Sequence, residues 1–114
     1  MLPLYVTSGE PAGIGPDICL SLADRVDERP IVVLADIHML KQRAEILNQQ
    51  IELIEYQGQS DTSAQGQLYV EHVALNTEVV LGKLNSQNSA YVLEQLHRSA
   101  DYAMQGKSVG VATA

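Results

Sequence analysis

Strand-like and helix-like patterns alternate along this 114-residue chain, and that alternation restricts the possible fold more than any other feature. Short apolar runs predict strands, and apolar residues that recur every three or four positions predict helices. This order is typical of a layered α/β domain, with helices on both faces of a mostly parallel sheet. The predicted strands are 2–7, 30–35, 51–56, 68–73 and 108–113, and the predicted helices are 16–24, 37–48 and a long one that starts within 85–89 and ends near 105.

The apolar spacing also predicts which helix faces are buried. In the first helix we expect Ile18 and Leu22 to face the core, with Cys19 as a small buried neighbour. Asp36 stands where a helix N-cap belongs, and Gly106 stands where a helix C′ residue belongs. The two later helices carry the apolar stripes Ile37, Leu40, Ala44, Leu47 and Leu93, Leu96, Ala100, Ala103.

Charge and composition exclude several kinds of partner. The formal net charge is −7, from 14 acidic and 7 scattered basic residues, so a nucleic-acid backbone is not the expected partner. The longest apolar run is residues 31–35, far below the roughly 20 residues that span a bilayer, so no membrane segment is predicted. The N-terminus carries no basic signal region and the chain has one cysteine, which makes the cytoplasm the expected compartment.

A glycine-bearing turn follows the first predicted strand. Residues 9–15 read Gly-Glu-Pro-Ala-Gly-Ile-Gly and lead into Pro16 at the start of a helix. In a parallel sheet such a turn lies at the carboxyl end of a strand, where ligands bind. The segment lacks the Gly-Lys-Ser/Thr of a Walker A loop and the third glycine of the dinucleotide fingerprint. Pro16 removes a donor and Asp17 adds a negative charge, which disfavours phosphate binding, so ligand contact and a tight turn packed on a neighbouring domain both stay open.

The segment 9–17 resembles the N-terminal signature of the 4-hydroxythreonine-4-phosphate dehydrogenases. It is also similar to the shorter Gly-Asp-Gly-Ile-Gly-Pro turn of isocitrate and isopropylmalate dehydrogenases, which share that fold. Residues 88–96, Asn-Ser-Ala-Tyr-Val-Leu-Glu-Gln-Leu, look like the family's long helix. Residues 109–114 look like the strand that normally leads into a Pro-x-x-Lys segment. The resemblance therefore spans the chain, and the nine-residue signature is its most specific part.

This resemblance implies an enzyme that uses NAD or NADP to oxidise 4-(phosphooxy)-L-threonine, a phosphorylated amino acid. The 3-oxo acid formed, 2-amino-3-oxo-4-(phosphooxy)butanoate, then loses CO₂ to give 3-amino-2-oxopropyl phosphate, on the route to pyridoxal 5′-phosphate. A divalent metal (Zn, Mg or Co) held by three histidines polarises the substrate, and the active site is completed by the second subunit of a homodimer.

The resemblance places the family's catalytic, metal-binding and phosphate-binding residues after the point where this sequence ends, so none is assigned within residues 1–114. Ile14 is the position carried over as a cofactor contact, with Gly13 and Gly15 as the backbone that allows it. The chain is then expected to be the N-terminal part of one α/β domain in a longer two-domain enzyme, and inactive by itself. Two alternatives stay open: a stand-alone, non-catalytic α/β small-anion binding or interaction module, and a paralogous dehydrogenase for a related hydroxy acid.

Other titratable residues carry weaker signals. His38, His72 and His97 are far apart in the sequence and form no metal-binding spacing, so surface or structural roles are predicted for them. Glu52 and Glu55 are three residues apart on a predicted strand, which puts them on opposite faces and favours a solvated edge over acid–base work.

Overall fold

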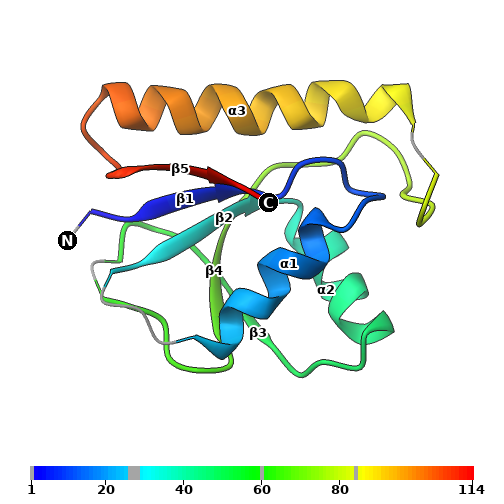
Figure 1. Cartoon of the computed structure of the whole chain (residues 1–114), viewed down its shortest axis with the longest axis horizontal. Coiled ribbons are helices and arrows are strands. Elements are labelled where there is room, and N and C mark those ends of the chain that lie inside the picture. The colour runs from blue at the N-terminus through cyan, green and yellow to red at the C-terminus, as the bar shows by residue number, and fades with distance from the viewer. Residues whose placement is uncertain (1, 26–28, 60, 84) are drawn as a thin grey trace.

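The computed structural model describes residues 2–25, 29–59, 61–83 and 85–114. Within these ranges the elements follow the predicted order (Figure 1). The strands are β1 (Leu4–Thr7), β2 (Ile31–Ala35), β3 (Glu52–Glu55), β4 (Gln67–His72) and β5 (Gly110–Thr113). The helices are α1 (Gly15–Ser21), α2 (Ile37–Ile46) and α3 (Ser89–Met104), with short 3₁₀ turns at Leu22–Asp24 and Ser86–Asn88.

The described strands form a parallel sheet of five strands in the order β3-β4-β2-β1-β5. Thr7 at the end of β1 is aligned with Leu34 on one side and with Thr113 on the other. His72 at the end of β4 is aligned with Ala35 at the end of β2. The strands β1, β2, β4 and β5 therefore end at one carboxyl edge of the sheet. This arrangement confirms the predicted α/β class with its mostly parallel sheet.

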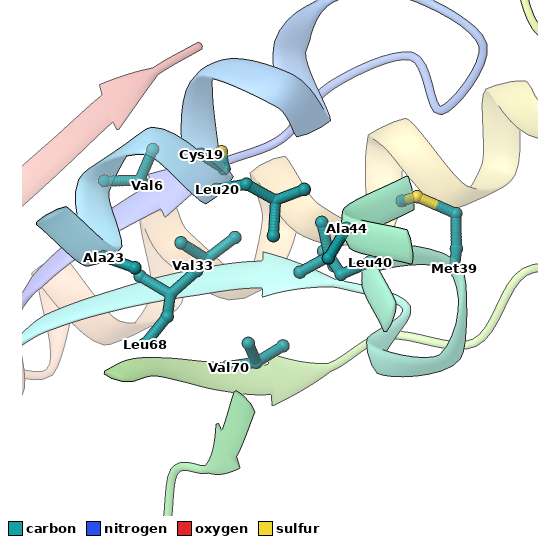
Figure 2. Packing of buried hydrophobic residues seen from close by; sticks show 11 residues of the cluster. Val6, Cys19, Leu20, Ala23, Val33, Met39, Leu40, Ala44, Leu68 and Val70 are labelled. Atoms are coloured by element: carbon teal, nitrogen blue, oxygen red, sulfur yellow. The ribbon is translucent and has the colours of Figure 1, made fainter. Parts of the chain in front are cut away.

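Helices cover both faces of the sheet, as expected for an αβα arrangement. In Figure 1, α3 runs along one side of the sheet, and α1 and α2 lie on the other. Alternate residues of β2 point to opposite faces, because strand side chains alternate. Val33 packs with Leu20 of α1 and Leu40 of α2 (Figure 2), whereas Val32 and Leu34 pack with Tyr91 of α3. The continuous apolar run of β2 is thus buried on both faces.

Several local predictions are confirmed by these elements. The Asp36 side chain caps α2 by accepting hydrogen bonds from the N–H groups of His38 and Met39, at 2.9 and 3.1 Å. Gly106 follows α3 with φ of +71°, the left-handed conformation of a helix C′ residue. β3 occupies one end of the described strand order, and Glu52 and Glu55 are exposed there, so the solvated edge is confirmed.

Two predictions about buried faces are wrong. Ile18 is 46 % exposed, because α1 turns Cys19, Leu20 and the following Ala23 toward the sheet instead. In α3 the predicted stripe of Leu93, Leu96, Ala100 and Ala103 is exposed. The buried face of α3 consists of Tyr91, Gln95 and Ser99.

The reason for the α3 error is that polar groups fix the rotation of this helix. Tyr91 and Gln95 form hydrogen bonds at the carboxyl edge of the sheet. Near the other end of the helix, the Tyr102 hydroxyl donates to Glu71 Oε2 of β4 at 2.7 Å, and the Tyr102 ring lies 4.8 Å from that of Tyr5. Periodicity identifies the apolar face of a helix, but it does not say which layer that face meets.

Candidate functional site

The glycine-bearing turn lies at the carboxyl edge of the sheet, between β1 and α1. Its first glycine, Gly9, has φ of +72°, so a side chain there would be strained. The Ser8 hydroxyl donates to the Leu34 carbonyl at 2.9 Å, and the Ser8 N–H donates to the same carbonyl at 3.4 Å. The end of β5 reaches the same place, since the Ala114 N–H donates to Thr7 at 3.0 Å. The turn therefore begins between the carboxyl ends of β2 and β5.

Gly13, Ile14 and Gly15, the predicted cofactor-binding positions, occupy the second half of this turn. A Cβ on Gly15 would lie 2.0 Å from the Ser8 carbonyl oxygen, so only glycine allows α1 to start this close to the end of β1. A Cβ on Gly13 would lie 3.4 Å from the Glu10 carbonyl oxygen. Ile14 occupies the N-cap position of α1 without a side-chain cap hydrogen bond, and the residue is 73 % exposed. The two glycines thus allow the turn to pack closely against its own backbone. In this conformation Ile14 is exposed to solvent.

Arg43 of α2 binds the turn from one face of the sheet. Its side chain is 4 % exposed. One guanidinium nitrogen donates to the Gly13 carbonyl at 3.1 Å and to Asp17 Oδ1 at 2.7 Å, and the other donates to the Pro11 carbonyl. In the sequence, Arg43 is only one of the scattered basic residues. The signal that could have identified it is its position between Leu40 and Ala44, on the buried stripe of α2.

Gln95 and Tyr91 of α3 bind the turn from the other face. Gln95 Oε1 accepts a hydrogen bond from the Gly9 N–H at 3.0 Å, and it lies 3.4 Å from the Ser8 hydroxyl oxygen. The Tyr91 hydroxyl lies 3.5 Å from the Ser8 hydroxyl. Burial raises the pKa of Tyr91, so its hydroxyl stays protonated and can donate as well as accept. Both layers of helices therefore hold the same turn.

A polar pocket of about 490 Å³ opens at the start of α2, beyond the ends of β2 and β4. Asp36 forms part of its wall, and its Oδ2 accepts a hydrogen bond from the Leu75 N–H at 2.9 Å. Both oxygens of this carboxylate are thus already bound by backbone donors. The other lining residues are His38, Met39, Gln42 and residues 75–79.

Two of the three histidines meet near this pocket. The rings of His38 and His72 are 5.5 Å apart in an edge-to-face arrangement, although the residues are far apart in the sequence. His72 Nδ1 accepts a hydrogen bond from the Ile37 N–H at 3.1 Å, which gives it a structural role at the start of α2. His97 lies on the exposed side of α3. Within the described ranges, no group of three or more His, Cys, Asp or Glu side chains could hold a metal ion.

Cys19 is fully buried, as predicted, and burial raises the pKa of its thiol from 9.0 to about 12. A thiol with such a pKa is protonated at neutral pH, and only the thiolate is a good nucleophile. Cys19 is therefore a core residue.

As for the membrane, none of the helices in the described part of the chain has the length and apolar character that crossing a bilayer needs.

These features define an α/β domain with a parallel sheet, a class of fold in which ligands generally bind at the carboxyl edge. The family model of the pyridoxal phosphate biosynthetic protein PdxA matches residues 27–114, and the chain belongs to that family.

Individual relatives agree with this assignment. The chain is 44 % identical over 112 residues to a 4-hydroxythreonine-4-phosphate dehydrogenase of Vibrio cholerae, covering 96 % of this chain and 34 % of the relative. It is 46 % identical over 106 residues to the enzyme of the same name from Neisseria meningitidis, covering 93 % of this chain and 31 % of the relative. The chain thus spans about a third of the length of the curated relatives that it matches.

Solved structures carry the same fold. A crystal structure of 4-hydroxythreonine-4-phosphate dehydrogenase from Klebsiella pneumoniae superposes with a TM-score of 0.86 at 27 % identity. The superposition covers all of this chain and 37 % of that one. The dehydrogenase-like fold that the glycine-bearing signature implied is therefore confirmed.

Proposed function

We propose that this chain supplies one part of an NAD(P)-dependent dehydrogenase that oxidises 4-(phosphooxy)-L-threonine in pyridoxal 5′-phosphate biosynthesis. The product, 2-amino-3-oxo-4-(phosphooxy)butanoate, decarboxylates to 3-amino-2-oxopropyl phosphate. The observation that carries the proposal is the 44 % identity to the Vibrio cholerae enzyme over 112 residues. A homodimer and a cytoplasmic location belong to the same proposal.

Within that enzyme, we assign a cofactor contact to Ile14. Its exposed apolar side chain, at the carboxyl edge of the sheet, suits the flat face of a nicotinamide ring. A bound nicotinamide would supply the hydride acceptor for oxidation of the substrate hydroxyl. Gly13 and Gly15 support this contact by letting the turn pack closely. The hydrogen bonds from Arg43 to the Gly13 carbonyl and from the Gly9 N–H to Gln95 hold the turn in place, and we call the two side chains the clamps of the turn.

The divalent metal implied by the family is not assigned to this chain. The described residues offer no cluster of three metal-binding side chains, and both oxygens of Asp36 are engaged by N–H donors. No step of the reaction is therefore derived through a metal held by residues 1–114. The small-anion alternative has less support, because Asp17 brings a carboxylate to the first turn of α1 and Pro16 lacks an N–H.

A chimaera tests the proposed function directly. This chain would replace the corresponding third of the Vibrio cholerae enzyme, and reduction of NAD and NADP would be followed by absorbance with 4-(phosphooxy)-L-threonine as substrate. We expect substrate-dependent reduction by the chimaera, none by residues 1–114 alone, and full activity of the unaltered relative. A chimaera that folds, by circular dichroism and gel filtration, yet leaves both cofactors oxidised would contradict the proposal.

The Ile14 contact has its own test in the same chimaera. Ile14→Asp places a charge where the apolar ring face is proposed to lie, and we expect the KM for the cofactor to rise about tenfold or more. Ile18→Asp is the matched control, because Ile18 is an isoleucine of α1 that is 46 % exposed and lies outside the turn. Equal effects of the two variants would remove the assignment of Ile14.

A further inference from the structure

Arg43 is a buried cation whose hydrogen-bond partners all lie in one short segment, residues 11–17. It binds the carbonyls of Pro11 and Gly13 and the carboxylate of Asp17, although it lies on α2, 26 to 32 residues away in sequence. A buried arginine is stable only when its charge and its N–H donors are matched. The segment 11–17 provides that match. The burial of Arg43 on α2 therefore depends on the conformation of the turn, and the conformation of the turn depends on Arg43.

The other hydrogen bonds of the turn do not replace this clamp. The Gly13 N–H donates to the Glu10 carbonyl at 3.1 Å, and the Ala12 N–H donates to Glu10 Oε1 at 3.2 Å, which are contacts within the turn itself. The Gly82 N–H donates to the Ala12 carbonyl at 3.0 Å, from another loop. For the carbonyls of Pro11 and Gly13, the partner found in the described ranges is Arg43.

We infer that Arg43 is a positioning residue for cofactor binding: its guanidinium sets the conformation of residues 11–17 and thereby aims the Ile14 side chain. This inference rests on the proposed function. The planar fork of arginine can reach two carbonyls and a carboxylate at once, whereas the ammonium of lysine is a point charge on a flexible stem. The arrangement is therefore specific for arginine, and Arg43→Lys retains the charge while losing part of the clamp.

A positioning role and a purely structural role of Arg43 lead to different changes in the kinetic constants of the enzyme. An interaction that binds the cofactor equally in the ground state and in the transition state affects KM and leaves kcat unchanged. Losing Arg43 should therefore raise the KM for NAD(P) and spare kcat and the KM for the phosphorylated substrate. A purely structural role would lower the amount of folded enzyme and its thermal stability, with unchanged KM values.

The first test uses residues 1–114 themselves, with amide hydrogen exchange as the readout. In Arg43→Met we expect exchange of the amides in residues 12–18 to accelerate by about tenfold or more, with the amides of β2 changed far less. Lys41→Met is the matched control, since Lys41 is exposed on the same helix. Uniform acceleration across the sheet, or none in residues 12–18, would overturn the inference. Should Arg43→Met fail to fold, Arg43→Lys and Asp17→Asn replace it in the same experiment. For each of these variants we expect a smaller acceleration of amide exchange, confined to residues 12–18.

The second test uses the chimaera with the Vibrio cholerae enzyme. For Arg43→Met we expect the KM for NAD(P) to rise by about tenfold, with kcat and the KM for 4-(phosphooxy)-L-threonine within about twofold, and an intermediate KM for Arg43→Lys. A fall in kcat at unchanged cofactor KM would overturn the inference. Absence of activity in the unsubstituted chimaera would count against the proposed function instead, and the exchange experiment would still decide whether Arg43 positions the turn.

Discussion

The Tyr91 hydroxyl oxygen accepts a hydrogen bond from the backbone N–H of Asp36 at 2.9 Å, and this contact joins α3 to the end of β2. Asp36 is also the N-cap of α2 and binds the Leu75 N–H. One residue thus connects the helix layers on the two faces of the sheet at its carboxyl edge. Because Tyr91 is only 2 % exposed, water cannot replace its hydroxyl at that N–H group.

Tyr91→Phe should therefore destabilise the chain by about 1–3 kcal/mol, the cost of leaving a buried donor without an acceptor. The measurement is urea unfolding followed by circular dichroism. Tyr102→Phe is the matched control, since its hydroxyl bonds to Glu71, which Arg98 also contacts. A loss for Tyr91→Phe no larger than that for Tyr102→Phe would show that the contact with Asp36 matters little.

Local sequence patterns predicted most of the fold, because strands, helix caps and turns are set largely by interactions between residues that are close in the sequence. The apolar run of β2, the cap at Asp36 and the left-handed Gly106 each depend on neighbouring residues, and each is confirmed. The exposure of Leu93 and Leu96 could not be predicted in this way. It depends on where Tyr91 and Gln95 find partners on other elements, which is long-range information.

The same distinction applies to the site. The position of the turn at the carboxyl edge follows from the strand-to-helix order, and Ile14 is exposed there. The hydrogen bonds of Arg43 and Gln95 to the turn join residues 26 or more positions apart, as in Arg43 to Asp17 and Gln95 to Gly9. A single sequence carries no direct signal for such pairs. A charged residue on a buried helix stripe, as in Arg43, is the nearest indication that a partner must exist.

Gly15→Ala should be among the most damaging small substitutions in the chain. The added Cβ would lie 2.0 Å from a backbone oxygen, which cannot move without shifting β1 or α1. We expect a loss of at least about 3 kcal/mol in the free energy of unfolding. Gly110→Ala is the control, since nothing lies within 4 Å of a Cβ there, and it should change stability by less than about 0.5 kcal/mol. Gly15→Ala with near-native stability would contradict the close approach of α1 to β1.

The buried Cys19 thiol makes stability depend on alkaline pH. Its pKa is 9.0 in an exposed reference state and about 12 in the folded chain, because burial disfavours the thiolate. The stabilising contribution is thus fully present below pH 9 and is lost as the pH rises toward 12. Over that range Cys19 should cost about 1.4 kcal/mol of stability for each pH unit.

The experiment compares the original chain with Cys19→Ala by urea unfolding at pH 8, 9, 10 and 11. Tyrosine ionisation affects both chains, so the difference between them isolates the thiol. We expect the difference to be constant from pH 8 to about 9 and then to shrink or reverse as the original chain loses stability faster. Parallel curves up to pH 11 would show that the thiol is more accessible than the structure indicates.

The exposed stripe of α3 should make the isolated chain associate with itself. Leu93 and Leu96 are 54 % and 42 % exposed, and Met104 at the end of the helix is 86 % exposed. An exposed apolar stripe on a small domain favours association, because burying it against a second copy removes it from water. The degree of association should therefore increase with protein concentration.

Sedimentation velocity over a hundredfold range of concentration would measure this. The double variant Leu93→Glu/Leu96→Glu should shift the population toward monomer, while its free energy of unfolding stays within about 1 kcal/mol, since both side chains already face solvent. Gln49→Glu/Gln50→Glu adds the same negative charge at exposed positions elsewhere and should leave association unchanged. If the unsubstituted chain sediments as a monomer throughout, or if both double variants dissociate it equally, the α3 stripe is not the associating surface.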